Sequence, residues 1–539
     1  MVHEITVPKH KQQVIDIGDG LCMRWSTSAD AENVAELVGD AFRFSSFGEK
    51  PDDEIPGKHE PLMCCVRRLL SGHSLAMSEY DYALVENTLA APGENPIIAC
   101  AALHEMPSYY GCVMMNFGKP EQIACHRNYR NRGLVRRLMK EMIHPESEYR
   151  GHVIQYLPGI DYFYRQFGYE YALSSPDGRE MSDLDSNIPK LEEGEQERYR
   201  LREAILDDVP YLTRLSANKE TLFLHKTAVG TVYDERYWRH FVHDIYQPPH
   251  ISWYDKSRTV TIIRDEKKGR DIGFNQHVYL NGLGWQKFAL EEGVAISDVI
   301  YPVMRQMVAL AKKQAKACHE YEMSKKEEEK VEKVEKVEKN TAIEGDDSTL
   351  CESESPPEIT TITFELSQEH PALEFLSSKF DPTPDEPDAM LYTRINDYAA
   401  FITKVAPALE ERLARSRTFA GISATLQLHF FKKVEGMNAP GLKVVFENGK
   451  VVKAQDWKKP TPEQKVEAVC KRKAAKLPEP KVFQAQFYPL MFTQLLMGSR
   501  SARDLIWANS DNAVQDSESR LLLDVLFPKV EHDIDLLIW

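Results

Sequence analysis

The segment that most constrains the fold is Cys125–Ile143, where a short apolar strand over 122–125 runs into a basic turn and an amphipathic helix. The helix carries apolar residues at helical spacing, namely Leu134, Val135, Leu138, Met139 and Met142. A helix N-terminus presents unpaired backbone N–H groups, and Gly133 allows an anion to approach the backbone closely. Arginines beside the turn can add charge-assisted hydrogen bonds. The segment therefore predicts a binding site for a pyrophosphate group.

The same turn carries a pattern of known type. Arg130-x-x-Gly133-x-Val135 resembles the Arg-x-x-Gly-x-Gly/Ala signature with which acetyltransferases of the GNAT superfamily bind acyl-CoA. Val135 departs from the small residue usual at that position. For this pattern taken alone, the alternative is an ordinary helix start with a basic cap.

A second pattern follows at a fixed distance. The apolar run 152–157 predicts a strand that ends at Pro158-Gly159, and 160–169 predicts a short helix capped by Gly168. The sequence from Tyr164 to Tyr169 resembles the Tyr-x-x-Phe-Gly-Tyr hallmark of GNAT enzymes. Both patterns, with their order and spacing, resemble the Eis-type (enhanced intracellular survival-like) family.

The resemblance implies roles for individual residues. Tyr164 would donate a proton to the thiolate that leaves from acetyl-CoA, although a packing tyrosine is the alternative. Backbone groups of the strand would pair with the pantetheine arm, and the turn would hold the pyrophosphate. The residues assigned to acetyl-CoA are Ile123, Ala124, Cys125, Arg130, Asn131, Arg132, Gly133, Leu134, Val135, Arg136, Gly159 and Ile160.

The apolar end of the sequence, Leu536-Leu537-Ile538-Trp539, predicts a tail that packs against protein. In the resembled family the carboxylate of a final Phe acts as the general base, and Trp539 stands in its place. A terminal carboxylate is ionised at neutral pH, because its ordinary pKa is roughly 3.5. A structural plug is the alternative role for the tail, and Glu121 is the rival base.

Composition excludes several classes of protein. The 539 residues contain no apolar stretch of membrane-spanning length, and the N-terminus lacks the apolar core of a secretory signal. The nine cysteines show no metal-ligand spacing, so we expect a cytoplasmic protein without a bound metal. A net charge of −16 disfavours nucleic acid and weakly favours a basic substrate.

A similar pattern of strand, turn and helix occurs twice in the chain. Arg24 is followed by Asp30 and an apolar helix face, and Arg202 is followed in the same way by Asp208. This repetition predicts tandem GNAT folds, the second of which lacks the acyl-CoA pattern, as in Eis-type proteins. A low-complexity insertion at about 324–357 begins with Lys–Glu repeats that can extend a helix and continues into a segment expected to be disordered.

We therefore expect an α+β protein with mixed α/β sheets of the GNAT type in three domains. They are a catalytic domain at 1–185, a degenerate GNAT domain at 190–394 and a sterol-carrier-like α+β domain at 395–539. In the last of these, 425–430 predicts a strand, 442–454 a hairpin turning at Asn448-Gly449, and 487–496 a helix.

The predicted function is acetyl-CoA-dependent N-acetylation of a primary amine by direct attack in a ternary complex. The resemblance implies polyamine-like, aminoglycoside-like or lysine-type acceptors. No cysteine or serine lies in a motif that would support an acyl-enzyme. Two alternatives remain at this point, a non-catalytic acyl-CoA-binding protein and a lipid-carrier-like protein. The sequence leaves open the acceptor, the acyl length and whether the chain forms a homo-oligomer.

Overall fold

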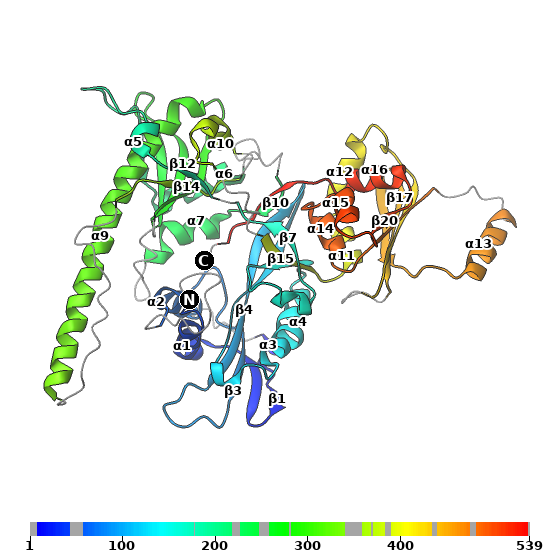
Figure 1. Cartoon of the computed structure of the whole chain (residues 1–539), viewed down its shortest axis with the longest axis horizontal. Coiled ribbons are helices and arrows are strands. Elements are labelled where there is room, and N and C mark those ends of the chain that lie inside the picture. The colour runs from blue at the N-terminus through cyan, green and yellow to red at the C-terminus, as the bar shows by residue number, and fades with distance from the viewer. Residues whose placement is uncertain are drawn as a thin grey trace. The chain divides into compact units, whose positions relative to one another are not determined.

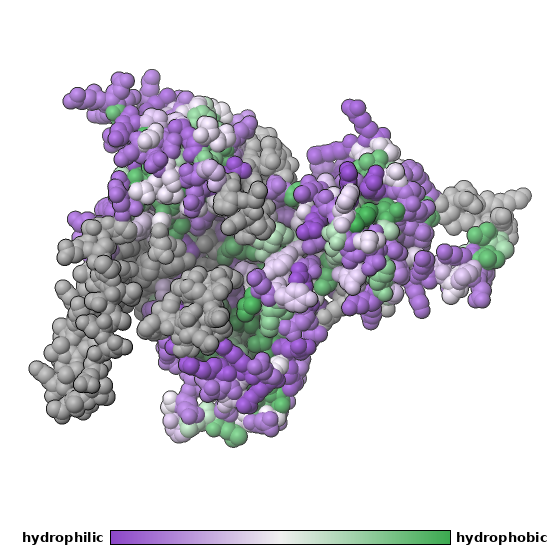
Figure 2. All heavy atoms as spheres, in the orientation of Figure 1, coloured by the Kyte–Doolittle hydropathy of each residue, from purple (hydrophilic) through white to green (hydrophobic). Residues whose placement is uncertain are grey.

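The computed structural model describes residues 8–43, 58–176, 178–217, 227–246, 258–279, 282–339, 358–367, 370–382, 390–433, 439–474 and 481–536. The chain divides into two compact units. The first unit comprises Met1–Pro176, Leu224–Arg236 and Pro387–Trp539, and the second comprises Asp177–Phe223 and Tyr237–Glu386. Among the coloured residues on the face shown in Figure 2, hydrophilic ones predominate, as expected for a protein surface.

A ten-stranded mixed sheet forms the centre of the first unit (Figure 1). Its main path runs β1 (Ile15–Gly18), β2 (Leu21–Trp25), β3 (Tyr82–Asn87), β4 (Ile97–Tyr110), β5 (Val113–Cys125), β6 (Ile154–Leu157), β15 (Met390–Ile395) and β7 (Glu170–Ser174). Two further strands, β10 (Thr227–Thr231) and β21 (Glu531–Asp533), extend from the second half of β4. Strands from three distant parts of the sequence therefore build one sheet.

Successive side chains of a strand point to opposite sides of the sheet, and in this sheet both sides are covered by a hydrophobic core. Ala83 and Val85 face one core, which contains Leu138, and Tyr82 and Leu84 face the other. Figure 1 shows the helices of the two sides with the sheet between them. One side carries α1 (Ala31–Ala41) and α2 (Glu60–Leu69), and the other carries α3 (Leu134–Arg137) and α4 (His144–Tyr149).

The predicted repeat of the strand-to-helix start is confirmed. Strand β2 leads through η2 (Ser28–Asp30) into α1, and β9 (Tyr199–Glu203) leads through η6 (Leu206–Asp208) into α6 (Val209–Ala217). Arg24 donates two hydrogen bonds to Asp30, at 2.9 and 2.7 Å, and Arg202 donates two to Asp208, at 2.7 and 2.8 Å. Each aspartate also accepts a backbone N–H three residues earlier, so the same ion pair fixes the same turn in both units.

We predict that Asp30→Asn lowers the free energy of unfolding by about 2 kcal/mol at pH 7, because the half-buried Arg24 loses the charge of Asp30 and keeps its ion pair with Glu86. Burial would raise the pKa of Asp30, but the hydrogen bonds from Arg24 and Thr27 lower it below its usual value. Such a carboxylate stabilises the fold above its unfolded pKa of about 3.9 and loses this effect as pH falls through the folded value. Calorimetric unfolding at several pH values, with Asp208→Asn as the matched variant, should show a difference that shrinks below about pH 4. A difference independent of pH would count against the ion pair.

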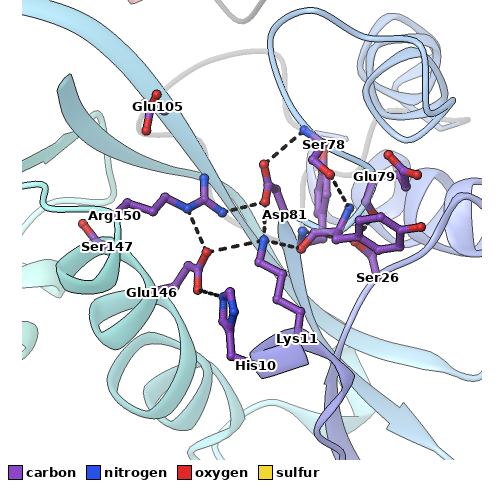
Figure 3. A network of polar contacts seen from close by, with 12 residues as sticks. His10, Lys11, Ser26, Ser78, Glu79, Asp81, Glu105, Glu146, Ser147 and Arg150 are labelled. Carbon is purple, nitrogen blue, oxygen red and sulfur yellow. Dashed lines mark hydrogen bonds and ion pairs between the residues drawn. The ribbon is translucent and has the colours of Figure 1, made fainter. Parts of the chain in front are cut away.

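A network of buried charges ties the start of the described chain to the sheet (Figure 3). Lys11 lies between Asp81, with which it makes an ion pair, and Glu146 at 3.5 Å. Arg150 contacts the same two acids, at 2.5 and 2.8 Å. His10 lies 2.9 Å from Glu146. Burial would raise the pKa of both acids, but Lys11 and Arg150 lower it below its usual value, so both carboxylates are charged at neutral pH.

The second unit is built on a six-stranded sheet with a single path. Its order is β8 (Arg179–Met181), β14 (Ile362–Phe364), β13 (Leu283–Leu290), β12 (Arg270–Tyr279), β11 (Arg258–Asp265) and β9. The helices of this part of the chain are α5 (Leu184–Asn187), α6, α7 (Glu235–Val242), α9 (Ile296–Lys339) and α10 (Pro371–Phe375). Trp285, Phe288 and Met304 lie in its core.

Helix α9 continues through the Lys–Glu repeats to Lys339, as the i,i+4 pairs predict. The rest of the low-complexity insertion, residues 340–357, lies outside the described residues. Among the described residues, no helix is long and apolar enough to cross a bilayer.

The C-terminal part of the first unit has a five-stranded sheet of its own. Its order is β18 (Lys450–Asp456), β17 (Gly441–Glu447), β16 (Ala424–Phe430), β19 (Val482–Phe487) and β20 (Ala513–Val514). The helices around it are α11 (Tyr398–Lys404), α12 (Ala406–Arg415), α13 (Pro462–Ala474), α14 (Met491–Met497), α15 (Ala502–Ala508) and α16 (Ser517–Leu526). The predicted hairpin is confirmed, with positive φ at both Asn448 and Gly449.

Two predictions for this region need correction. Phe487 ends strand β19 and the helix begins only at Met491, because the segment around Phe487 pairs with β16. Residues 390–394, assigned from the sequence to the second domain, form β15 between β6 and β7 of the first sheet. The proposed three-domain division and the likeness of 395–539 to a sterol carrier remain predictions.

Candidate active site

The parallel strands β5 and β6 diverge after one point of contact. Among the described residues they share a single register pair, Gly118 with Gln155. Beyond it, β5 continues to Cys125 and pairs only with β4, for instance Cys125 with Ala99. A shift in the β4–β5 register and a positive φ at Gln122 accompany this divergence. One edge of Ile123–Cys125 therefore faces the opening, where an extended amide chain could add as a strand.

The turn after β5 has the backbone expected for an anion site. Asn131 and Gly133 have φ values of 64° and 75°, and a Cβ atom at Gly133 would meet nothing within 4 Å. Such left-handed residues turn successive N–H groups toward one point, just before α3 begins at Leu134. The residues of this site that are exposed are Arg130, Asn131, Arg132, Gly133 and Arg136. The open space at Gly133 fits a phosphate group.

The apolar residues of the turn serve the fold. Leu134 is buried in the core on this face of the sheet, and Val135 packs against the same core. Val135 is the residue that departs from the acyl-CoA pattern, and its side chain does not lie within 4 Å of a Cβ atom placed at Gly133. The departure is therefore compatible with an anion at the turn.

The helix after the turn differs from the predicted one. Residues Leu138–Ile143 form a π-helix between α3 and α4. The sequence predicted one regular α-helix, which would place Leu134, Leu138 and Met142 in a row. Within the π-helix Leu138, Met139, Met142 and Ile143 are all buried. Helical periodicity alone could not show this change, because the same residues are apolar in either case.

One arginine, Arg136, connects the turn with the segment that carries Tyr164, and two others hold the turn itself. Arg136 donates to the Gln166 side chain at 2.5 Å, and Gln166 belongs to η5 (Phe163–Phe167), a 3₁₀-helix. The Arg132 guanidinium lies over the ring of Tyr129, 4.8 Å from its centroid, and Arg130 donates to the carbonyl of Cys125 at 3.3 Å. The two sequence motifs are therefore joined by a direct contact.

Tyr164 is almost fully buried beside the diverging strands, with 6% of its surface exposed. A Cβ atom at Gly159 would lie 2.3 Å from the Tyr164 ring, so only glycine fits there. Burial raises the pKa of Tyr164, which keeps the phenol protonated at neutral pH and fits a proton donor. Ile160, assigned to acetyl-CoA with Gly159, is 66% exposed. The predicted Gly168 cap is confirmed, with φ of 86°.

One neighbour of Tyr164 was missed by sequence reasoning. Tyr392 on β15 lies 5.5 Å from Tyr164 between ring centroids and stacks on Tyr171 at 4.0 Å. It is fully buried although it lies more than two hundred residues further along the chain. No local pattern links residue 392 to the site, because the strand that carries it joins the sheet through long-range pairing.

Glu121, the rival base, lies on β5 near two basic side chains, with 11% of its side chain exposed. Its carboxylate lies 3.1 Å from Lys119 Nζ and 3.7 Å from His104 Nε2. Burial raises the pKa of Glu121, and Lys119 opposes this shift. Burial and the Lys119 charge lower the pKa of His104 to about 3, so this imidazole is neutral at neutral pH. The raised pKa of Glu121 lies closer to neutral pH than that of an ordinary glutamate, which suits a general base.

The C-terminal tail reaches the same region. The Leu536 carbonyl accepts a hydrogen bond from Lys119 at 2.9 Å, and the Asp535 carbonyl accepts one from Tyr156 on β6 at 3.3 Å. Trp539 itself lies outside the described residues. Within the described part of the chain, no group of three or more metal-binding side chains comes together.

Comparison with known proteins agrees with this geometry. Residues 24–172, which contain β5, the turn and Tyr164, match the family model described as Acetyltransferase (GNAT) domain. No curated protein matches the sequence. The first unit therefore carries a GNAT domain, and the mixed α/β architecture of the chain is a GNAT fold with an added sheet in the C-terminal region.

Solved structures resemble nearly the whole chain in fold. A GCN5-related N-acetyltransferase from Kribbella flavida aligns over 95% of this chain and 97% of its own, with a TM-score of 0.55 and 12% identity. A GCN5-related N-acetyltransferase from Anabaena variabilis aligns over 95% and 99%, with a TM-score of 0.55 and 12% identity. Eis1 from Mycobacterium abscessus aligns over 94% and 97%, with a TM-score of 0.50 and 12% identity. At this identity the likeness concerns the fold.

Proposed function

We propose that the protein is an acetyl-CoA-dependent N-acetyltransferase that acetylates a primary amine by direct attack. The observation that carries this proposal is the coincidence, in one GNAT domain, of diverging strands, an open glycine turn and a buried phenol. The edge of Ile123–Cys125 would bind the pantetheine arm, and the N–H groups of the Arg130–Gly133 turn would bind the pyrophosphate.

The transfer needs two proton movements. The amine nitrogen attacks the thioester carbonyl and forms a C–N bond, and the C–S bond breaks with its electron pair on sulfur. Tyr164 gives its phenolic proton to the departing thiolate. A carboxylate accepts the proton that the amine loses. After product release, exchange with solvent returns Tyr164 to its protonated form.

Two carboxylates compete for the role of base. Two observations support the Trp539 carboxylate as the base. One is the Eis-type resemblance, and the other is the hydrogen bond from Lys119 to the carbonyl of Leu536, the last described residue of the tail. Glu121 is supported by its burial on β5 and its raised pKa. We propose Trp539 as the base and Glu121 as a second acceptor nearby.

A pair of variants separates the two carboxylates. An extension of a few glycines and serines after Trp539 should lower kcat about 30-fold, since Glu121 remains to accept protons, and Glu121→Gln should lower it only about threefold. Steady-state kinetics with acetyl-CoA and a responsive amine would measure both. The opposite ranking would assign the base to Glu121, and full activity of the extended protein would exclude the tail carboxylate.

The same proposal includes an Eis-type architecture and a class of amine acceptor. Eis-type architecture is supported by the alignment over nearly the whole of both chains with Eis1 from Mycobacterium abscessus. Polyamine-like, aminoglycoside-like and lysine-type amines are the acceptors we propose to test first, on the basis of the sequence resemblance. An acetyl-CoA consumption assay over this panel is the direct experiment.

A further inference from the structure

The C-terminal tail is joined to the first sheet by a continuous series of contacts within the first unit. Strand β21 pairs in parallel with β10, which itself pairs with β4. The His532 ring lies 3.1 Å from the backbone N of Ser174 and 2.9 Å from the Met497 carbonyl. The backbone N–H of Asp535 donates to the Thr231 hydroxyl at 2.9 Å. The direction of the tail is therefore fixed up to residue 535.

Beyond this point the tail meets a charged side chain. Lys119 Nζ donates to the carbonyl of Leu536 at 2.9 Å and lies 3.1 Å from the Glu121 carboxylate. Lys119 is fully buried and lies opposite His104 in the β4–β5 ladder. A buried ammonium is stable only where acceptors surround it. Here the acceptors include a carboxylate of β5 and a carbonyl of the tail.

The position of Lys119 follows from the strand that carries it. Lys119 and Glu121 are two residues apart on β5, so their side chains leave the same face. The neighbouring Gly118 makes the register pair with Gln155, beyond which β5 and β6 diverge. Lys119 thus stands beside the start of the opening into which acetyl-CoA is proposed to extend.

We propose that Lys119 is a positioning residue that holds the C-terminal tail at Leu536 beside Glu121. Its ammonium joins the two segments that supply the candidate bases, β5 and the tail. It contacts no reacting atom itself. The effect of this contact on turnover rests on the proposed acetyltransferase function, whereas the contact itself does not.

Other charged and titratable groups surround the contact. Tyr82 of β3 and Tyr156 of β6 are fully buried phenols whose pKa is raised by burial and also by the charge of Glu121, and His104 of β4 is neutral. Of the two basic side chains, Lys119 lies nearer to the Glu121 carboxylate, at 3.1 Å against 3.7 Å for His104. Replacement by an apolar residue would leave the Leu536 carbonyl without this donor.

Hydrogen exchange of the full-length protein, without acetyl-CoA, tests the contact directly. In Lys119→Met, backbone amides of residues 531–536 should exchange at least about tenfold faster than in the wild type, because the tail loses its last described hydrogen bond. Lys119→Arg, which keeps the charge and a donor, should return exchange toward the wild-type rate. Lys404→Met, an exposed lysine of α11, serves as the matched control and should leave the tail unchanged.

A general loss of stability must be distinguished from loss of the contact. Lys119→Met leaves the Glu121 carboxylate buried without its cation, so the double variant Lys119→Met/Glu121→Gln removes both charges. We expect this double variant to keep wild-type exchange in β3 and to retain the fast exchange of residues 531–536. Unchanged tail exchange in both variants, or equally accelerated exchange in β3 and the tail, would overturn the proposal.

Kinetics add a second, separate readout. Lys119→Met should lower kcat about tenfold while the Kd for CoA stays within twofold, and Lys119→Arg should restore most of the loss. An equal loss in CoA affinity would show that Lys119 belongs to the CoA site and would contradict a positioning role. If the wild type turns over no amine, the proposed function fails, and the exchange experiment still decides whether Lys119 holds the tail.

Discussion

Gly133→Glu should abolish measurable CoA binding. The new side chain would occupy the open space beside Gly133, and its charge would repel the pyrophosphate. Charge-assisted hydrogen bonds contribute roughly 1.5–3 kcal/mol each, so the loss of two of them weakens binding by a factor of about 100 or more. Calorimetric titration with CoA, together with a thermal unfolding curve, measures the effect.

Gly151→Glu is the matched control for this variant. Gly151 also has a positive φ, of 78°, and open space around its Cβ position. Gly151 follows the C-terminal end of α4, away from the turn at Gly133. A glutamate at Gly151 therefore strains the backbone as much as one at Gly133 but lies outside the proposed pyrophosphate site. We expect the control to bind CoA as the wild type does. Wild-type affinity in a folded Gly133→Glu protein would rule out the Arg130–Gly133 turn as the pyrophosphate site.

Tyr164→Phe should lower kcat by about 100-fold or more with a modest change in KM. The phenylalanine ring keeps the contacts with Gly159 and Tyr392 and removes only the proton that the leaving thiolate needs. Tyr162→Phe is the control, because Tyr162 is a neighbour that is 75% exposed. Steady-state kinetics and CoA titration of both variants make the comparison. Wild-type turnover of Tyr164→Phe would assign this residue to packing.

The local parts of the site could be predicted from the sequence because glycines and short motifs determine them. Gly133 and Gly168 take left-handed conformations at the positions where the pattern places a turn and a helix cap. The repeated strand-to-helix start follows from the spacing of six residues between Arg24 and Asp30 and between Arg202 and Asp208, whereas the ion pairs within these two starts were not predicted. In each case the interacting groups lie within one turn or one supersecondary element.

The long-range parts could not be predicted in this way. Tyr392 reaches Tyr164 through a strand inserted between β6 and β7, and the Leu536 carbonyl reaches Lys119 across most of the sequence. The pairing of distant strands depends on the whole sheet and leaves no periodicity in either segment. The one usable signal was the Lys119–Glu121 pair itself, two charges on the same face of a strand with no other charged residue.

The most direct test of the proposed function is turnover by the purified wild-type protein. Acetyl-CoA would be incubated with polyamine, aminoglycoside and lysine acceptors, and free thiol and acetylated amine would be measured in the same samples. The proposed mechanism predicts that at least one acceptor gives equal amounts of CoA thiol and N-acetylated product, and that Tyr164→Phe suppresses both. CoA binding at the Arg130–Gly133 turn without acetylation of any amine would contradict it.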